Sequence, residues 1–519
     1  MLNRPLTPRD WVGFMIMVFG MFMAILDIQI VSSSIAEIQA GLSASADEIS
    51  WVQTSYLIAE VVMIPLTGIL SRLFSTRVFF AVAAAGFTAT SALCALAWDI
   101  NSMIIFRAAQ GFLGGAMIPT VFATSFIVFP PEKRNFLSVL MGLVATMAPT
   151  LGPTLGGWLT QAFSWHWLFL ANLLPGIVVS VGVWLLVDFD KADRSLLKDF
   201  DYLGLLLMAV FLGCMQYAIE EGPRNDWLED PAIRNSAAVA VVFAVLFFWR
   251  AFTYRAPIVD LRAFADKNFT LGCIYSFIIG IGLYGSTYLT PVFLGQVRGF
   301  NALQIGEIMF VTGCFQFMSA PIAGRLAGKL DLRIMLAFGL TMFGLGVWMQ
   351  SHMSAEWGFW QFFVPQAVRG FALMFLFIPI NAVALGTLPP QRLKNGSGLY
   401  NLMRNLGGAI GLAGINTIIN DRLALHWARL VEPLTQGNPN LQRFMDGAQG
   451  TMSGAMGDST TLASAKLLAK LVHQQAEVLT LADTQLVMAG IFFSALLAIP
   501  LLSKPRTAPA KAPASAEAH

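Results

Sequence analysis

The sequence predicts an all-helical integral membrane protein of about fourteen transmembrane helices, with two six-helix halves and two helices inserted between them. The composition carries the first part of this prediction. Of 519 residues, 56% are hydrophobic and only 12% are charged, whereas soluble domains contain about 25% charged residues. An internal repeat carries the second part, because segments of the first half recur at a nearly constant spacing in the second. Such a composition gives no reason to expect nucleic acid as a partner.

Windows of about 19 residues with high hydropathy mark the helices in chain order. The expected spans of the first half lie at residues 12–34, 50–71, 78–98, 102–127, 136–162 and 167–187. Two inserted spans follow at 202–219 and 235–252, and the spans of the second half lie at 268–290, 304–325, 332–351, 358–387, 396–419 and 485–503. Each is long enough to cross a hydrocarbon core of about 30 Å.

These spans divide the chain into four parts. Residues 1–187 form the N-terminal half, residues 188–267 hold the two inserted helices with their connectors, and residues 268–504 form the C-terminal half. Residues 505–519 are rich in Pro and Ala and are expected to form a disordered tail.

The placement of charge predicts the orientation in the membrane, because cytoplasmic loops carry an excess of Lys and Arg. With the N-terminus in the cytoplasm, most Lys and Arg residues of the connecting segments lie on that side. The short outer loops then hold or adjoin only Arg224, Arg234 and Arg298. Both termini are therefore expected in the cytoplasm.

The segment between the last two expected spans, residues 420–483, is long and lies on the outer side in this topology. Apolar residues recur in it at helical spacing, at Leu462, Ala465, Leu468, Ala469, Val472, Ala476 and Leu479. The pattern predicts an amphipathic helix that packs either on something outside the membrane or back on its own chain.

The internal repeat is visible at single residues. Pro65, Gly68, Leu70 and Arg77 recur 256 positions later as Pro321, Gly324, Leu326 and Arg333. The tripeptide Gln110-Gly111-Phe112 lies over Arg369-Gly370-Phe371, and Pro130-Pro131 lies over Pro389-Pro390, in both cases 259 positions later. Parallel repeats that handle substrate at their interface are typical of a large class of secondary transporters.

The stretch APTLGPTLGGW, residues 148–158, combines two prolines and three glycines inside an apolar run. In a soluble helix each interior proline would cost about 3 kcal/mol and each glycine about 1 kcal/mol. The composition therefore favours a buried position in which neighbours satisfy the freed backbone groups. Gly152 and Gly156 also have the spacing that lets a second helix approach closely. The stretch is either a kinked packing helix or part of the functional machinery.

Four short motifs occur in chain order. They are LDxxIV at Leu26, Asp27, Ile30 and Val31; RxxQG at Arg107, Gln110 and Gly111; GPxxGG at Gly152, Pro153, Gly156 and Gly157; and WxWxFxxNxP at Trp165, Trp167, Phe169, Asn172 and Pro175. In these motifs, and over essentially its whole length, the chain resembles the major facilitator superfamily and, within it, the fourteen-helix drug:proton antiporter family of the EmrB and QacA type. The EmrB branch is the most similar. The superfamily's loop motif GxLaDrxGrk reads GILSRLFSTR here, so Arg72 stands where an aspartate is usual. The aspartate's role as a conformational latch does not carry over.

The resemblance implies a proton-coupled multidrug efflux transporter of the bacterial inner membrane, which exports hydrophobic or amphiphilic compounds by alternating access. The proton gradient would take the place of a cofactor, and no enzyme activity is expected. The resemblance also implies that the bend at Pro153 limits leak of protons or substrate. A periplasmic adaptor and an outer-membrane channel could receive the substrate, with residues 420–483 as the candidate adaptor contact. Two alternatives stay open: export of an endogenous amphiphile such as a siderophore or a fatty acid, and a non-transporting membrane sensor or scaffold.

Ionisable residues inside membrane spans are costly and are therefore candidates for function. They are Asp27, Glu60, Arg107, Glu307, Arg369 and Arg404. At about 1.5 Å per residue, Asp27 lies roughly 22 Å from the cytoplasmic end of its helix, and Arg107 lies roughly 8 Å inside the outer end of its own. Because these depths nearly coincide, we expect the two side chains to face each other. They form either a proton-coupling pair or a permanent ion pair that fixes helix packing.

Glu60 is expected near the midplane of the membrane, roughly 15 Å from the outer surface. A carboxyl group held away from water disfavours its charged form and suits a proton carrier. Contact with a cationic substrate and a structural hydrogen bond are the alternatives. Glu307 lies about one turn from the outer face, where a solvated rim role fits equally. Arg369 and Arg404 could pair with Asp27 or Glu60, hold an anionic substrate group or satisfy backbone carbonyls.

Polar residues within or near the spans could line a substrate cavity with otherwise apolar walls. The candidates are Gln29, Gln53, Tyr56, Gln216, Tyr284, Tyr288, Gln316 and Asn381, together with Arg369 and Arg404. No metal site is expected, because the four cysteines lie far apart in apolar segments and the five histidines form no cluster. A GxGxxG match at Gly280, Gly282 and Gly285 lies inside an apolar span and predicts no dinucleotide site.

Overall fold

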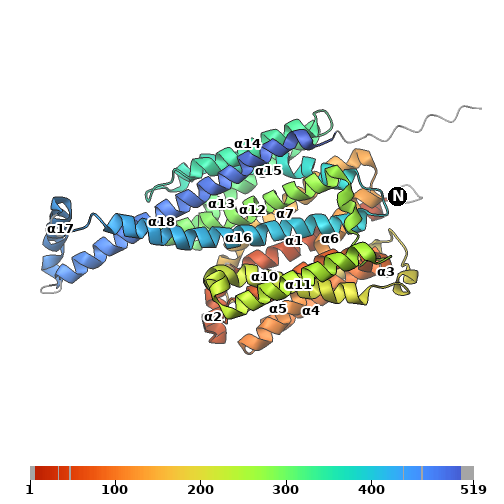
Figure 1. Cartoon of the computed structure of the whole chain (residues 1–519), viewed down its shortest axis with the longest axis horizontal. Coiled ribbons are helices and arrows are strands. Elements are labelled where there is room, and N and C mark those ends of the chain that lie inside the picture. Colours follow the sequence, from red (N-terminus) through yellow and green to blue (C-terminus); the bar gives the residue numbers. More distant parts are fainter. Residues whose placement is uncertain (1–5, 33, 46–47, 436–437, 457–459, 504–519) are drawn as a thin grey trace, which may run out of the picture.

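Figure 1 shows a computed structural model of the chain, which describes residues 6–32, 34–45, 48–435, 438–456 and 460–503. Within these residues every regular element is a helix, and no strand occurs. Thirteen segments of the described chain are long and apolar enough to cross a membrane. The predicted tail, residues 505–519, lies outside the described residues.

The first half contains the six spans that hydropathy predicts. They are α1 (Pro8–Ser32), α3 (Trp51–Phe74), α4 (Thr76–Ala95), the consecutive pair α5 (Ile100–Gly114) and α6 (Met117–Val128), α7 (Pro131–Ala162), and the consecutive pair α8 (His166–Leu170) and α9 (Leu173–Leu186). One short helix was not predicted: α2 (Ile35–Leu42), which follows α1 directly. The break between α5 and α6 falls at Gly115 and Ala116, directly after Gly114, consistent with the low helix propensity of glycine.

The inserted segment forms two antiparallel helices, α10 (Tyr202–Glu221) and α11 (Pro231–Thr253), which pack on each other. Short turns flank them: η1 (Arg194–Leu197), η2 (Gly222–Arg224), η3 (Trp227–Glu229) and η4 (Leu261–Ala265). Only α10 packs extensively on the rest of the bundle, against α3. The side chains of Val241, Val245 and Trp249 on α11 are 61–64% exposed, as expected of a face that meets lipid.

The second half contains α12 (Lys267–Val292) with its terminal turn η5 (Phe293–Val297), α13 (Ala302–Leu326), α14 (Leu332–Gln350), α15 (Phe359–Gly386), α16 (Leu393–Val431), α17 (Pro439–Met456), and α18 (Thr460–Ala495) with the turn η7 (Leu496–Leu501). The expected span at 396–419 is part of α16, which carries several polar residues and is not among the thirteen apolar segments. It nevertheless lies in the bundle between α12, α3 and α18.

The prediction for the outer segment needs correction. Residues 420–483 are not a separate loop between two spans: α16 continues to Val431, α17 follows, and the amphipathic stretch from Leu462, helical as predicted, is the first part of α18. The two helices run beyond the bundle side by side, with α17 at their tip (Figure 1). The physical reason is that no proline lies between Leu462 and Ala495, so nothing in the sequence ends the helix at the membrane surface.

Capping residues explain where many of these helices begin. Aspartate or asparagine side chains accept a backbone N–H at the starts of α5, α10, α11, α12, α13 and α14, from Asp99, Asp201, Asp230, Asp266, Asn301 and Asp331. Each such cap satisfies a donor that the first helical turn leaves free and stabilises the helix by about 1 kcal/mol.

The repeat in the sequence is also a repeat in packing. A Cβ atom added at Gly111 would lie 2.2 Å from the carbonyl oxygen of Tyr56, and one added at Gly370 would lie 2.2 Å from that of Thr312. Helices α5 and α15 therefore approach α3 and α13 in the same manner, and in both pairs only glycine allows the contact. The two halves share one plan at the level of backbone contacts.

Candidate functional site

We describe the bundle by its two ends. The near end is where α1 begins, α3 ends and α16 begins; the far end is where α1 ends and α3 begins. Two features lie between them: a buried polar network in the first half, and a cavity between the halves.

The network is built around Asp27 of α1 and Arg107 of α5. The Arg107 Nη1 atom lies 2.7 Å from Asp27 Oδ2, and both side chains are fully buried. The structure thus brings together the two residues that the depth argument paired. Arg107 also donates through Nε to the carbonyl oxygen of Val52 at 3.2 Å, and its guanidinium carbon lies 4.2 Å from the centre of the Tyr56 ring.

Residues from three of the four motifs meet in this network. Asp27 Oδ1 accepts a hydrogen bond from Asn172 Nδ2 at 2.6 Å and another from Gln110 Nε2 at 3.2 Å. Gln110 accepts from Arg107 Nη1 at 2.7 Å and donates to Ser91 Oγ at 2.6 Å. Ser91 was not predicted, since a serine in an apolar span gives no signal of its own. This enclosed set links α1, α4 and α5 with the turn between α8 and α9, and only Nη2 of Arg107 lacks a hydrogen-bond partner among the described buried side-chain atoms of the set.

The cavity has a volume of about 510 Å³ and lies between the two halves. Its lining reaches from Glu60 in the middle of α3 to residues at the far ends of several helices: Ser32, Glu37, Gln53, Gln161, Glu220 and Gln296. The cavity therefore extends toward the far end of the bundle.

Glu60 connects the cavity to both halves of the chain. Its side chain is 2% exposed, lines the cavity and accepts a hydrogen bond from Asn405 Nδ2 of α16 at 3.3 Å. Among the described residues, no Lys, Arg or His lies within ion-pair distance of Glu60. A buried carboxyl group with one amide partner and no cation is a typical functional group inside a membrane.

Half of the predicted substrate residues line this cavity. They are Gln29, Gln53, Gln216, Tyr284 and Tyr288. Tyr56, Gln316, Asn381, Arg369 and Arg404 do not line it. Seven polar lining residues were not predicted: Ser32, Glu37, Gln161, Glu220, Thr287, Gln296 and Asn405. Glu220 lies one residue beyond the expected end of its span, where hydropathy had already fallen.

Three of the residues outside the lining form hydrogen bonds elsewhere, whereas the side chain of Asn381 and the hydroxyl of Tyr56 are buried without a hydrogen-bond partner among the described residues. Arg369 donates to Thr312 Oγ1 at 3.3 Å, within the second half. Arg404 donates to Asn401 Oδ1 and lies 5.2 Å from the centre of the Phe122 ring. Gln316 of α13 donates to Thr146 Oγ1 of α7 and so joins the two halves. Neither arginine forms an ion pair with Asp27 or Glu60.

The GPxxGG motif lies on α7, which stays helical through Pro149 and Pro153. Pro153 and Gly157 line the cavity, whereas Gly152 faces α1. A Cβ atom added at Gly152 would lie 2.3 Å from Cβ of Gln29. The glycine therefore lets α7 pack closely against α1 at Gln29, a residue of the cavity wall. At the equivalent place in the second half, a Cβ atom added at Gly411 would lie 3.0 Å from Cα of Ile281. The close contact is repeated, and the proline is not.

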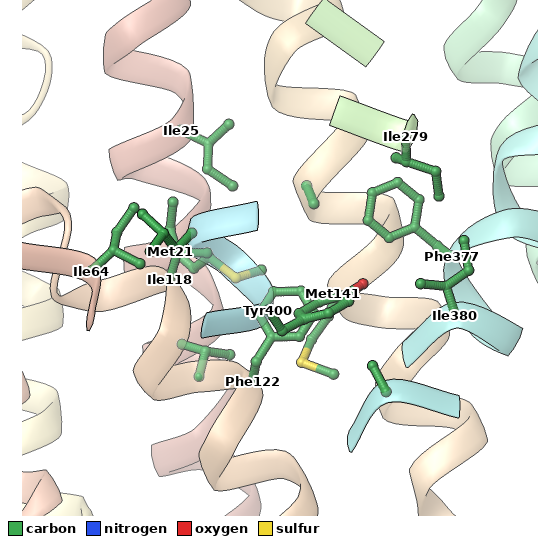
Figure 2. Packing of buried hydrophobic residues seen from close by; sticks show 14 of the residues in the cluster. Met21, Ile25, Ile64, Ile118, Phe122, Met141, Ile279, Phe377, Ile380 and Tyr400 are labelled. Atoms are coloured by element: carbon green, nitrogen blue, oxygen red, sulfur yellow. The ribbon is translucent and has the colours of Figure 1, made fainter. Parts of the chain in front are cut away.

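The near end is closed by apolar side chains from both halves. Figure 2 shows Phe122 of α6 beside Tyr400 of α16, with Met21, Met141 and Phe377 around them. The ring centres of Phe122 and Tyr400 are 6.0 Å apart. Ser397 Oγ of α16 also donates to the carbonyl oxygen of Pro119 at 2.6 Å. Helix α16 therefore seals this end against α3 and α6.

Polar contacts cover this seal. Lys394 at the start of α16 pairs with Asp190 and donates to the carbonyl oxygen of Ser71 at 3.1 Å and to Thr76 Oγ1 at 3.2 Å. Thr76 in turn donates to Asp190 through its backbone N–H at 2.8 Å and its hydroxyl at 3.0 Å. Arg72 bonds only to the carbonyl oxygen of Gly68 among the contacts that the described residues show for its side chain. An ion pair between the second half and the connector that follows the first half is thus present near the altered loop motif.

Comparisons with known proteins agree with this architecture. The sequence pattern described as Major Facilitator Superfamily matches residues 17–412. The colistin resistance protein EmrB of Acinetobacter baumannii is 47% identical over 428 residues, which cover 82% of this chain and 84% of that protein. The multidrug export protein EmrB of Escherichia coli K12 is 30% identical over 486 residues, which cover 93% of each chain. The fatty acid resistance protein FarB of Neisseria gonorrhoeae is 28% identical over 487 residues, which cover 94% of each.

Two solved structures share the fold at low sequence identity. The human organic anion transporter MFSD10 has a TM-score of 0.58 at 12% identity, covering 96% of this chain and all of that one. A bacterial homologue of the human lysosomal transporter Spinster, in an inward-facing and unoccupied conformation, has a TM-score of 0.54 at 12% identity, covering 98% of this chain and all of that one. With the repeat, the helices and the relatives in agreement, this multi-pass membrane protein belongs to the Major Facilitator Superfamily, in the group of the EmrB proteins.

Proposed function

We propose that this chain is a proton-coupled exporter of hydrophobic or amphiphilic compounds in the bacterial inner membrane, working by alternating access. The observation that carries the proposal is the position of Glu60, a buried carboxyl group without a cation partner among the described residues, on the lining of a cavity between the two halves. The printed functions of the relatives, which include multidrug export and resistance to colistin and fatty acids, support it.

The orientation follows from the Lys and Arg distribution, which favours a cytoplasmic near end. In that orientation the cavity faces the periplasm, and the seal around Phe122 and Tyr400 separates it from the cytoplasm. Both chain termini are then cytoplasmic. The projecting parts of α16 and α18, with α17 at their tip, reach into the periplasm and are the proposed contact for an adaptor that leads to an outer-membrane channel.

Glu60 gives a direct way to couple the inward flux of protons to the outward flux of substrate. A proton that enters from the periplasm neutralises the carboxylate and weakens its hold on a bound substrate, which leaves outward. The protonated protein then closes its far end and opens its near end, where Glu60 releases the proton to the cytoplasm. The carboxylate is then ready for the next substrate. Proton and substrate move in opposite directions because both require the same group.

Asp27 and Arg107 act in this proposal as positioning residues. Asp27 already accepts hydrogen bonds from Arg107, Asn172 and Gln110, and it lies off the cavity lining. Arg107 packs on Tyr56, one helical turn before Glu60 on α3. The network therefore fixes the turn of α3 that presents Glu60. The prediction that Asp27 itself carries the proton remains the competing assignment.

Inverted membrane vesicles test the proposal with Glu60→Gln. Glutamine keeps the size of the side chain and an acceptor for Asn405, but it cannot bind and release a proton at physiological pH. Uptake driven by a pH gradient should be abolished, while binding of a substrate to the purified variant should persist. Glu307→Gln is the matched control, because Glu307 is exposed on α13 and does not line the cavity. Full uptake by Glu60→Gln would refute the role of Glu60, and loss of uptake in Asp27→Asn alone would assign the proton to Asp27.

A further inference from the structure

The far end of α10 is fixed to both halves of the protein. On the side of the first half, Thr54 Oγ1 of α3 donates to Glu221 Oε1 at 2.9 Å, and the rings of Trp51 and Tyr217 stack with centres 5.3 Å apart. Helix α10 of the inserted segment is therefore held against the far end of α3, beside the α3 residues that line the cavity.

The turns that follow α10 reach the second half. Trp227 Nε1 donates to Thr417 Oγ1 of α16 at 2.9 Å. Asn420 Nδ2 of α16 donates to the carbonyl oxygen of Pro223 at 2.9 Å. The inserted segment thus bridges the two halves at the far end, and its helix α10 lies beside the cavity.

This arrangement directs Glu220 into the cavity. Successive residues of a helix point about 100° apart, so the anchoring of buried Glu221 on Thr54 turns Glu220 to a different face. Gln216, one turn earlier, lies on the same face as Glu220. Both residues line the cavity, and Gln216 Nε2 lies 3.5 Å from Glu220 Oε2. The pair forms a polar strip that α10 contributes to the wall.

The charge of the wall has one sign. Glu37, Glu60 and Glu220 line the cavity, and the described lining holds no Lys, Arg or His. Neither Glu60 nor Glu220 forms an ion pair within the described residues. Glu60 is only 2% exposed, so neither water nor a cation among the described residues compensates its charge. Tyr284 and Tyr288 of α12 add aromatic rings to the wall, and aromatic faces attract cations. Apart from these groups the wall is largely apolar, with residues such as Leu57, Ile305 and Leu412.

From these contacts we infer that α10 is part of the substrate site and that Glu220 is a specificity-determining residue, which selects amphiphiles carrying a positive charge. The inference rests on the proposed function, since it names the class of compound that the cavity accepts. It also weighs against a fatty acid as cargo, because a carboxylate would meet three acidic side chains and no resident cation in the described lining.

A pair of probes of nearly equal size and opposite charge tests the inference: tetraphenylphosphonium and tetraphenylborate. Binding to the full-length protein in uncharged-lipid nanodiscs is measured by calorimetry. The wild type should bind the cation at least about tenfold more tightly than the anion. Glu220→Gln should lower the affinity for the cation by about tenfold, the effect of roughly 1.4 kcal/mol, and leave or raise the affinity for the anion.

Glu229→Gln provides the matched control. Glu229 is exposed in η3, close in sequence to Glu220, and it is not part of the cavity lining. Its substitution removes the same charge from the same end of the protein, and the preference for the cation should stay at the wild-type value. An equal change in both variants would mean that the surface potential sets the preference, and the inference would fall.

The remaining outcomes separate this inference from the proposed function. A wild type that binds both probes equally, or prefers the anion, overturns the inference, as does equal loss of both probes in Glu220→Gln with the protein still folded by circular dichroism. Absence of proton-driven transport in wild-type vesicles, with a strong binding preference for the cation, would instead refute proton-coupled export and leave the specificity of the cavity intact.

Discussion

The contact of Lys394 with Asp190 makes a quantitative prediction about the closed near end. Lys394 belongs to the second half, and Asp190 lies in the connector after the first; their side chains are 14% and 26% exposed. A charge-assisted hydrogen bond is worth about 1.5 to 3 kcal/mol. Asp190 keeps both of its bonds from Thr76 when the lysine is removed, so no buried acceptor is orphaned. We therefore expect the lower value, about 1.5 kcal/mol.

The substitution Lys394→Met removes the charge and keeps most of the aliphatic stem, which limits the loss of packing. A change of about 1.5 kcal/mol shifts the equilibrium between closed and open near ends about tenfold toward open. Asp190→Asn should give a shift of similar direction, and the double variant should add little, because each single change already breaks the same contact.

Distances between spin labels measure this shift. Phe74 and Leu330 are exposed at the near end, 49% and 43%, one in each half, and suit labelling. Cys214 and Cys314 are only partly buried and would be replaced by serine so that they do not take up the label. Cys94 and Cys273 are fully buried and can stay. A larger population of long distances in Lys394→Met is the expected result.

A control guards against a general loss of charge. Arg392 pairs with Asp260 at 3.3 Å, and their side chains are 42% and 31% exposed. Exposed pairs contribute about 0 to 1 kcal/mol, so Arg392→Met should shift the distances much less. An unchanged distance distribution in Lys394→Met, or an equal shift in Arg392→Met, would refute the prediction that the contact of Lys394 with Asp190 stabilises the closed near end.

Two further predictions concern stability and partners. Gly111→Ala should destabilise the purified protein by about 1 to 3 kcal/mol, because its Cβ would lie 2.2 Å from the Tyr56 carbonyl oxygen, whereas Gly414→Ala, with nothing within 4 Å, should melt at or above the wild-type temperature; equal melting temperatures would contradict the packing argument. Replacing residues 430–465 by a short Gly-Ser linker should abolish co-purification with an adaptor and preserve transport in vesicles, because the contact of His426 with Asp483 at 2.9 Å lies outside the deletion. Unchanged co-purification would exclude this projection as the adaptor contact.

Much of the architecture could be predicted because membrane spans obey strong physical rules. Apolar length located the spans, and counting helical rise from each end placed Asp27 and Arg107 at the same depth, where the structure brings them within 2.7 Å. The repeat located Gly111 and Gly370, whose contacts are equivalent in the two halves. These predictions succeeded because each depends on one-dimensional quantities, namely depth and spacing along the chain.

The cavity could not be predicted in the same way, because its lining depends on which face of each helix points inward. Arg369 and Arg404 lie at plausible depths, yet they bond to Thr312 and Asn401 instead of lining the cavity. Glu220 lines it, although its neighbour Glu221 points to Thr54. Hydropathy also placed the end of the α16 span and the start of the α18 span at the membrane surface. Both helices extend further, because helical hydrogen bonding continues until a residue such as Pro433 interrupts it.

The inserted segment is attached to α16 at both of its ends. At the far end Trp227 and the Pro223 carbonyl hold Thr417 and Asn420, and at the near end the connectors hold α16 through Asp190 and through Asp260, whose backbone carbonyl oxygen accepts from Asn395 Nδ2 at 2.9 Å. A rocking motion between two rigid halves would have to break one set of these contacts or carry the insertion along. The proposed alternating access would therefore be a motion of three bodies, in which α10 and α11 limit how far the halves can swing apart.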